Sequence, residues 1–166
     1  QEEEAFWAFT QLMFDPAWHM QQFFTDGFPQ LECFSYVQNK LLEKHFPKIV
    51  AHMRKVEFDP YAIQPHAMEW YMDLFIRILP FEYVIRIIDV LMSRGIAAIF
   101  RFAMAVFDIL SADILKTDSF PYLMRDLKNP YPLFPRKSPA DKNSTLSPDD
   151  FVKIAMKYKI TSKQVE

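Results

Sequence analysis

The sequence predicts an all-α fold, and three observations support this prediction. Apolar residues recur at three- and four-residue steps along most of the 166 residues, the spacing that gathers side chains on one face of a helix. Only two glycines are present, and several of the twelve prolines lie between apolar segments, where they begin or end helices. Hydrophobic residues make up 51% of the chain, which suits one domain with a substantial core.

The first predicted helix covers Glu2 to Phe14 and ends at Asp15-Pro16, and its three glutamates lie near the positive end of the helix dipole. Its apolar stripe consists of Ala5, Phe6, Phe9, Leu12 and Met13. A short helix follows, carrying Trp18, Met20, Phe23 and Phe24, and Asp26-Gly27 predicts a turn. A longer helix is predicted over about Phe28 to His45, and Pro47 opens one or two further turns through Met53.

Three more helices are predicted, from Tyr61 to Ile78, from Phe81 to Ser93 and from Ile96 to Leu115. Pro80 separates the first two, and Gly95 is a natural stop for the second. The third helix has a wide apolar face, which predicts a central position in the fold.

Composition changes towards the C-terminus, where six prolines lie between Phe120 and Pro148. We expect an extended strap there, anchored by Tyr131, Leu133 and Phe134. Ser147-Pro148 is a typical helix start, and the final helix is expected to run to about Lys159. The predicted organisation is a helical unit of residues 1–127, a proline-rich strap of residues 128–147, and a C-terminal helix with a basic tail in residues 148–166.

Two parts of the sequence carry an ordered set of motifs. The first is Glu3-Glu4-Ala5-Phe6-Trp7-Ala8-Phe9. The second contains Trp70-Tyr71, Pro80-Phe81, Arg86-Ile87-Ile88-Asp89 and Gly95. Over about Glu2 to Leu110 this pattern resembles the C-terminal half of a TBC domain, an all-helical GTPase-activating domain for Rab-type small GTPases. The chain departs from the family by carrying Ile88 in place of tryptophan and Tyr71 in place of phenylalanine. The resemblance implies a multi-helix, orthogonal or solenoid-like bundle.

The catalytic residues of the family are an arginine in I-x-x-D-x-x-R and a glutamine in Y-x-Q-G, and both precede the E-E-x-A-F-W helix. This chain begins at Gln1, directly before that helix, so we expect no catalytic residue in it. Tyr36-Val37-Gln38 resembles Y-x-Q, but it follows the helix and continues as Asn39-Lys40. Its amphipathic surroundings predict that Gln38 is an ordinary helix residue.

The resemblance does not identify partner-binding residues, and we expect the matching positions to be structural. These positions are Glu3, Phe6, Trp7, Trp70, Pro80, Phe81, Arg86, Asp89 and Gly95. Trp7 and Trp70 suit core anchors. Glu82, Arg86 and Asp89 are spaced for an ion-pair ladder, which we favour over direct contact with a GTPase. Nothing in the pattern places Arg77, Arg94 or Arg101 as an arginine finger.

Other classes of function find little support. The formal charge of −2 offers no broad basic surface for nucleic acid, although residues 136–166 form a basic tail. Cys33 is the only cysteine, so the chain cannot form an internal disulfide. The histidines lack the spacing of metal ligands. Charged residues interrupt every candidate membrane span. No nucleophile–base pair or phosphate loop is visible, so we expect no metal, no cofactor and no enzymatic activity of the chain's own.

The expected role is therefore part of a Rab GTPase activator that acts in the cytoplasm, either free or peripherally attached to endomembranes. Its expected partners are a Rab-type GTPase carrying GTP and Mg²⁺, and the N-terminal half of the same TBC domain. A non-catalytic scaffold that binds a small GTPase or another protein is the alternative, and the chain is either a fragment or a natural short protein. If it is a fragment, then Phe6, Trp7 or Phe9 should be exposed or covered by another chain.

Overall fold

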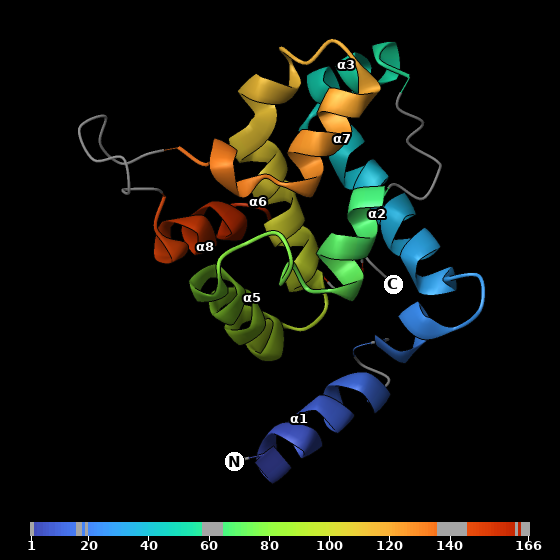
Figure 1. Cartoon of the computed structure of the whole chain (residues 1–166), viewed down its shortest axis with the longest axis vertical. Coiled ribbons are helices and arrows are strands. Elements are labelled where there is room, and N and C mark those ends of the chain that lie inside the picture. The colour runs from blue at the N-terminus through green and yellow to red at the C-terminus, as the bar shows by residue number, and fades with distance from the viewer. Residues whose placement is uncertain are drawn as a thin grey trace.

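The computed structural model describes residues 2–15, 18, 20–57, 65–135, 146–161 and 163. These residues form helices joined by turns, without a β-strand among them, which confirms the all-α prediction (Figure 1). In chain order the helices are α1 (Glu2–Phe14), η1 (Met20–Phe24), α2 (Pro29–His45), α3 (Pro47–Lys55), α4 (Pro65–Ala67), η2 (Met68–Met72), α5 (Phe81–Arg94), α6 (Ala97–Ile114), α7 (Phe120–Lys128), η3 (Tyr131–Leu133) and α8 (Pro148–Met156).

Helix α6 lies at the centre of the fold, as its wide apolar face predicts. Twelve of its 18 residues are buried, including Phe100, Phe102 and Phe107. It packs against α2, α3, α5 and α8, and Figure 1 shows it running through the middle of the helix cluster. A helix that is apolar on nearly all sides is stable only when neighbours surround it, and α6 has those neighbours.

The helix predicted from Tyr61 to Ile78 is wrong. Residues 61–64 lie outside the described part, and the remainder consists of the single turn α4 followed by the π-helix η2, which ends at Met72. Leu74 and Phe75 then have positive φ angles of 48° and 63°, which no continuing helix allows. Both side chains are buried, so tertiary packing holds the chain in this conformation although the apolar spacing favours a helix.

The other predicted helix boundaries agree with the structure to within a few residues, including the end of α8 at Met156, predicted at about Lys159. Helix α7 is absent from the prediction. The predicted start of α8 is confirmed, because the Asp150 N–H donates to Ser147 Oγ at 3.2 Å. Gly95 ends α5 with a φ of 77°, and its N–H donates to Leu91 O at 2.8 Å.

The segment after α7 packs onto the core and adds a buried side chain to it. The Phe134 side chain is buried, and its ring lies 5.9 Å from that of Tyr83 and 5.5 Å from that of Phe151. Tyr131 and Leu133, the other predicted anchors, are partly buried. Residues 136–145 of the predicted strap lie outside the described part. Phe134 and Phe151 belong to the same core as α6. The predicted boundaries after residues 127 and 147 stay predictions.

Candidate functional site

Helix α1 is apolar but contributes no buried residue. The side chains of Phe6, Trp7 and Phe9 are 61%, 60% and 61% exposed, which agrees with the expectation for a surface that needs a cover. Trp7 was also expected to be a core anchor, and within this chain it is not one. Figure 1 shows α1 at one end of the molecule, apart from the other helices, and its main backbone neighbour is η1.

Apolar side chains occupy two nearly opposite faces of α1. Phe9 and Met13 are four residues apart and share one face, whereas Trp7 and Phe14 are seven apart and share another. At 3.6 residues per turn, Trp7 points about 160° away from Phe9. One layer of neighbours therefore cannot cover both faces, and α1 has the pattern of a helix that is packed on two sides.

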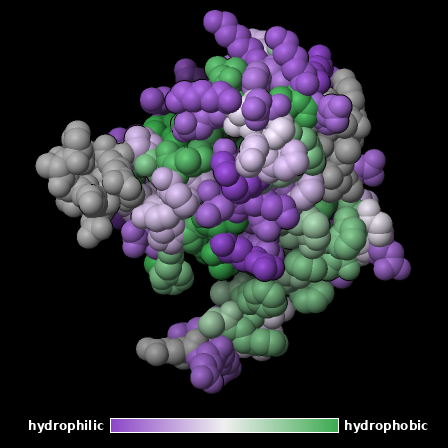
Figure 2. Space-filling model, turned by 45° about the horizontal axis from the view of Figure 1, so that its top comes forward, coloured by the Kyte–Doolittle hydropathy of each residue, from purple (hydrophilic) through white to green (hydrophobic). Residues whose placement is uncertain are grey.

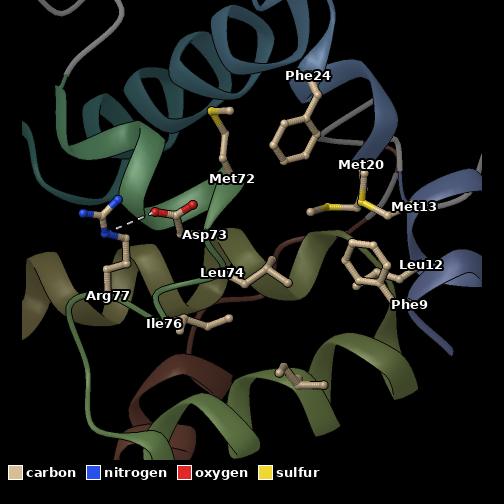
Figure 3. A pocket seen from close by; sticks show the side chains of 11 residues that line it. Phe9, Leu12, Met13, Met20, Phe24, Met72, Asp73, Leu74, Ile76 and Arg77 are labelled. Carbon is tan, nitrogen blue, oxygen red and sulfur yellow. Dashed lines mark ion pairs between the residues drawn. The ribbon is translucent and has the colours of Figure 1, made fainter. Parts of the chain in front are cut away.

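The inner face of α1 borders an apolar groove of about 440 Å³ (Figure 3). Its lining residues come from α1, η1, the end of η2 and the segment after it, and α5. They are Phe9, Leu12, Met13, Met20, Phe24, Met72, Asp73, Leu74, Ile76, Arg77 and Ile88. Figure 3 shows the side chains of Phe9, Met13 and Phe24 gathered on one side, with Leu74 and Ile76 opposite. The charged lining residues, Arg77 and Asp73, form an ion pair of 3.8 Å.

The outer surface of α5 extends this apolar region. Phe81, Ile85 and Met92 are exposed, and Ile88, which lies between them on the same helix face, lines the groove. Figure 2 shows hydrophobic residues along α1 and beside it, whereas the opposite end of the molecule in that view is mostly hydrophilic. Ile88 is also the position at which the sequence departs from the tryptophan of the family motif. Two lining residues of the groove, Phe9 and Ile88, thus lie within the motif segments.

Arg86 and Asp89 form part of the predicted ion-pair ladder on α5. Arg86 Nη1 lies 3.7 Å from Asp89 Oδ2, and Arg86 Nε lies 3.1 Å from Asp149 Oδ1. The second contact ties α5 to the first turn of α8. Sequence spacing did not suggest Asp149, because it follows Arg86 by more than sixty residues. All three side chains are substantially exposed, so solvent screens these pairs.

The other motif residues have structural surroundings of different kinds. Trp70 is fully buried, and its Nε1–H donates to Leu127 O in α7 at 3.0 Å. Pro80 precedes the first residue of α5, and Phe81, with 74% exposure, begins the outer apolar stripe. Glu3 lies exposed in the first turn of α1, where the helix dipole favours a carboxylate.

Gln38 is more than an ordinary helix residue, because it joins a buried polar network. The Tyr71 hydroxyl donates to Gln38 Oε1 at 2.6 Å, and Gln38 Nε2 lies 3.2 Å from His66 Nε2. Burial, assisted by Lys128, lowers the pKa of His66 to about 3, so the imidazole is neutral and its Nε2 accepts the amide proton. The network holds the Gln38 side chain inside the fold.

The arginines considered as fingers differ in their surroundings. Arg101 donates from Nε and Nη2 to Ile160 O, at 3.2 and 2.6 Å, and thereby fastens the chain after α8 to α6. Arg77 is paired on the groove rim, and Arg94 lies exposed in the last turn of α5. Within the described ranges, no three His, Cys, Asp or Glu side chains gather as metal ligands. The helices among these residues are too short or too polar to cross a membrane.

Comparison with known proteins shows to which family the chain is similar. Residues 1–115, more than half of the chain, match the family model of the Rab-GTPase-TBC domain. The chain is 26% identical over 117 residues to the human Ecotropic viral integration site 5 protein homolog, a match that covers 70% of this chain and 14% of that protein.

Two further relatives show the same partial coverage. Rab GTPase-activating protein tbc-11 of Caenorhabditis elegans is 26% identical over 117 residues, covering 70% of this chain and 12% of the relative. TBC1 domain family member 4 of the mouse is 25% identical over 131 residues, covering 79% and 10%. The chain thus spans only a small part of the length of each relative. From its motifs, its all-helical fold and the family match, the chain belongs to the Rab-GTPase-TBC domain family.

Proposed function

We propose that residues 1–166 form the scaffolding and partner-contacting part of a Rab GTPase-activating protein, and that its arginine and glutamine fingers lie outside these residues. The observation that carries this proposal is α1, an aromatic helix with no buried residue beside an apolar groove. Such a surface suits a helix that lies between two halves of a larger domain. The family match supports a role in GTPase activation, and the Rab named for the nematode relative supports the class of partner.

The surroundings of the candidate finger residues support their assignment to structure. A finger must project into the phosphate site of the partner. Gln38 is buried and bonded to Tyr71, and Arg101 is bonded to Ile160 O. Arg86 is bonded to carboxylates on α5 and α8. These side chains hold helices together, which is the support that a catalytic residue on a neighbouring segment needs.

In the proposed mechanism, the complete domain grips a Rab protein that carries GTP and Mg²⁺, and its fingers stabilise the charge that develops at the γ-phosphate and orient the attacking water. The present helices contribute by holding the finger-bearing half in place across α1 and the groove. The protein would work in the cytoplasm or at the surface of endomembranes.

Single-turnover GTP hydrolysis by a panel of Rab proteins tests this proposal. We expect acceleration by the full-length protein that contains residues 1–166, and hydrolysis at the intrinsic rate when purified residues 1–166 are added. A finger raises the rate by about 10³–10⁵-fold, so its presence would be evident. The purified chain is checked by mass. Acceleration by residues 1–166 alone would place a finger within this chain and contradict the proposal.

A binding measurement with the same Rab panel distinguishes the proposed function from the alternative, a non-catalytic scaffold. The non-catalytic scaffold requires that the full-length protein binds a Rab protein or another partner without accelerating hydrolysis by any Rab tested. That result would contradict the proposal in favour of the scaffold.

A further inference from the structure

The N-terminal part of the chain is strongly acidic. Its first 39 residues contain no lysine or arginine, and they carry the six acids Glu2, Glu3, Glu4, Asp15, Asp26 and Glu32. The next 18 residues have the opposite balance, with Lys40, Lys44, Lys48, Arg54 and Lys55 against Glu43 and Glu57. Charge is therefore segregated along the chain, and the acidic part includes α1 and η1, two of the elements that border the groove.

The groove itself adds no free positive charge. Its one basic lining residue is Arg77, whose Nε is paired with Asp73 Oδ2 at 3.8 Å. The remaining lining residues are aliphatic, aromatic or methionine. An occupant thus meets an apolar floor. The negative potential comes from acidic residues of the N-terminal part that lie outside the lining itself, beginning with Glu2, Glu3 and Glu4 at the start of α1.

We propose that the groove between α1 and α5 receives one amphipathic helix whose apolar face carries large aliphatic side chains and whose flanks carry lysine or arginine, supplied by the finger-bearing half of the TBC domain. This inference rests on the proposed function and adds the chemistry of the docking segment. The commitment to a basic helix comes from the charge segregation and from the unpartnered apolar faces of α1 and α5.

The length of α1 allows a second helix to lie along it. Helix α1 has 13 residues and is about 20 Å long, which gives room for anchors at positions i, i+3, i+4 and i+7 of a helix lying along it. Leu12 and Met13 on α1 form one wall, and Ile88 on α5 belongs to the other. Three of the lining residues are methionines, whose flexible thioethers adapt to different apolar side chains.

The same charges oppose a second copy of this chain as occupant. A parallel pairing of two α1 helices through their aromatic faces would bring two sets of Glu2, Glu3 and Glu4 together, with no lysine or arginine on either helix to compensate. Like charges brought together at an interface cost several kcal/mol. A basic helix makes the apolar contacts and also gains from the acidic surroundings.

Fluorescence anisotropy with three labelled 18-residue helical peptides tests the inference on purified residues 1–166. The first peptide carries a leucine stripe with lysine at the remaining charged positions, the second carries the same stripe with glutamate, and the third keeps lysine but has alanine in the stripe. We expect the leucine–lysine peptide to bind at least ten-fold more tightly than either of the others. Its affinity should fall as salt is raised from 50 to 500 mM, because ions screen the acidic surroundings.

A matched pair of α1 variants separates groove binding from general attraction to an acidic protein. Met13→Asp places a carboxylate in the groove, and Gln11→Asp places one on a face of the same helix about 160° away. Both add one negative charge. Met13 is partly buried, whereas Gln11 is exposed and donates to Asp15 Oδ2 at 2.9 Å, so the helicity of both variants is compared with that of the original chain. We expect Met13→Asp to weaken binding of the leucine–lysine peptide at least ten-fold and Gln11→Asp to leave it within two-fold.

Three results would overturn the inference. They are equal or tighter binding of the leucine–glutamate peptide, equal losses in the two α1 variants, and a dimeric mass in light scattering that the Met13→Asp substitution abolishes. The peptide assay contains no Rab protein, so its outcome is independent of the hydrolysis assay. Peptide binding as expected, together with a full-length protein that accelerates no Rab, would refute the proposed function and leave the groove chemistry standing.

Discussion

Helices α1 and α6 are both rich in apolar residues, yet their surroundings are opposite. None of the 13 residues of α1 is buried, whereas 12 of the 18 residues of α6 are. Helix α6 packs against α2, α3, α5 and α8, while α1 has η1 as its main neighbour. Composition therefore does not decide burial in this chain. The difference lies in which neighbours the described residues supply, and it makes α1 the helix that the proposed function assigns to an interface.

Alanine substitution of one phenylalanine in each helix is the strongest test of this comparison. Phe102 on α6 is fully buried and lies 5.3 Å from the ring of Phe151, so Phe102→Ala should lower the free energy of unfolding by about 3–5 kcal/mol. Phe6→Ala removes an exposed ring and should cost less than about 1 kcal/mol. Urea unfolding of purified residues 1–166 measures both values. A loss of about 3 kcal/mol for Phe6→Ala would show that α1 belongs to the core in solution.

The buried imidazole of His66 gives a second test on the core side of the comparison, and its expected effect on the free energy of unfolding is smaller. Its ring lies 6.2 Å from that of Phe107 on α6, and burial lowers its pKa to about 3. In the unfolded chain the pKa is near the ordinary value of about 6.5. Between these values the unfolded state binds a proton that the folded state does not, so stability is present above pH 6.5 and declines as the pH falls.

The expected decline is about 1.4 kcal/mol per pH unit well below pH 6.5. His66→Gln keeps an acceptor for the Gln38 amide and removes the titration. Between pH 7 and pH 5, the free energy of unfolding of the original chain should therefore fall by more than that of the variant. The carboxylates titrate in both proteins and cancel in the difference. Parallel pH dependences of the two proteins would show that His66 is not buried as a neutral group.

Much of α5, α6 and the start of α8 was predictable from the sequence, because local signals and packing agree there. The apolar spacing after Phe81, the stop at Gly95 and the serine cap at Ser147 each have a local physical cause. The break at Leu74 and Phe75 has no such signal. Two left-handed residues without glycine are held by burial of their side chains, and burial depends on residues distant in sequence.

The groove was only partly predictable. The doubly apolar pattern of α1 indicated that it needs a cover, but not where α1 lies. Met72 and Ile76 line the groove because the helix ends after η2 and the chain turns, and that break was not predicted. The position of Gln38 after the first motif helix predicts a non-catalytic residue, and that stays a prediction, whereas its bond to Tyr71 depends on how α2 meets η2.

The smallest expected effect concerns the ion pair between Arg86 and Asp149. Arg86 is a motif position on α5, which lies between α1 and α6 in the sequence. The side chains of the pair are 48% and 69% exposed, so a double-mutant cycle with Arg86→Gln and Asp149→Asn should give a coupling of about 0.2–1 kcal/mol that declines at high salt. A coupling that small implies that the contact between Arg86 and Asp149 adds little to stability. If Arg86→Gln also leaves the stimulation of Rab GTP hydrolysis by the full-length protein unchanged, the residue serves to orient α8. A loss of activity at unchanged stability would instead place Arg86 at the GTPase interface, next to the α5 stripe that continues the groove.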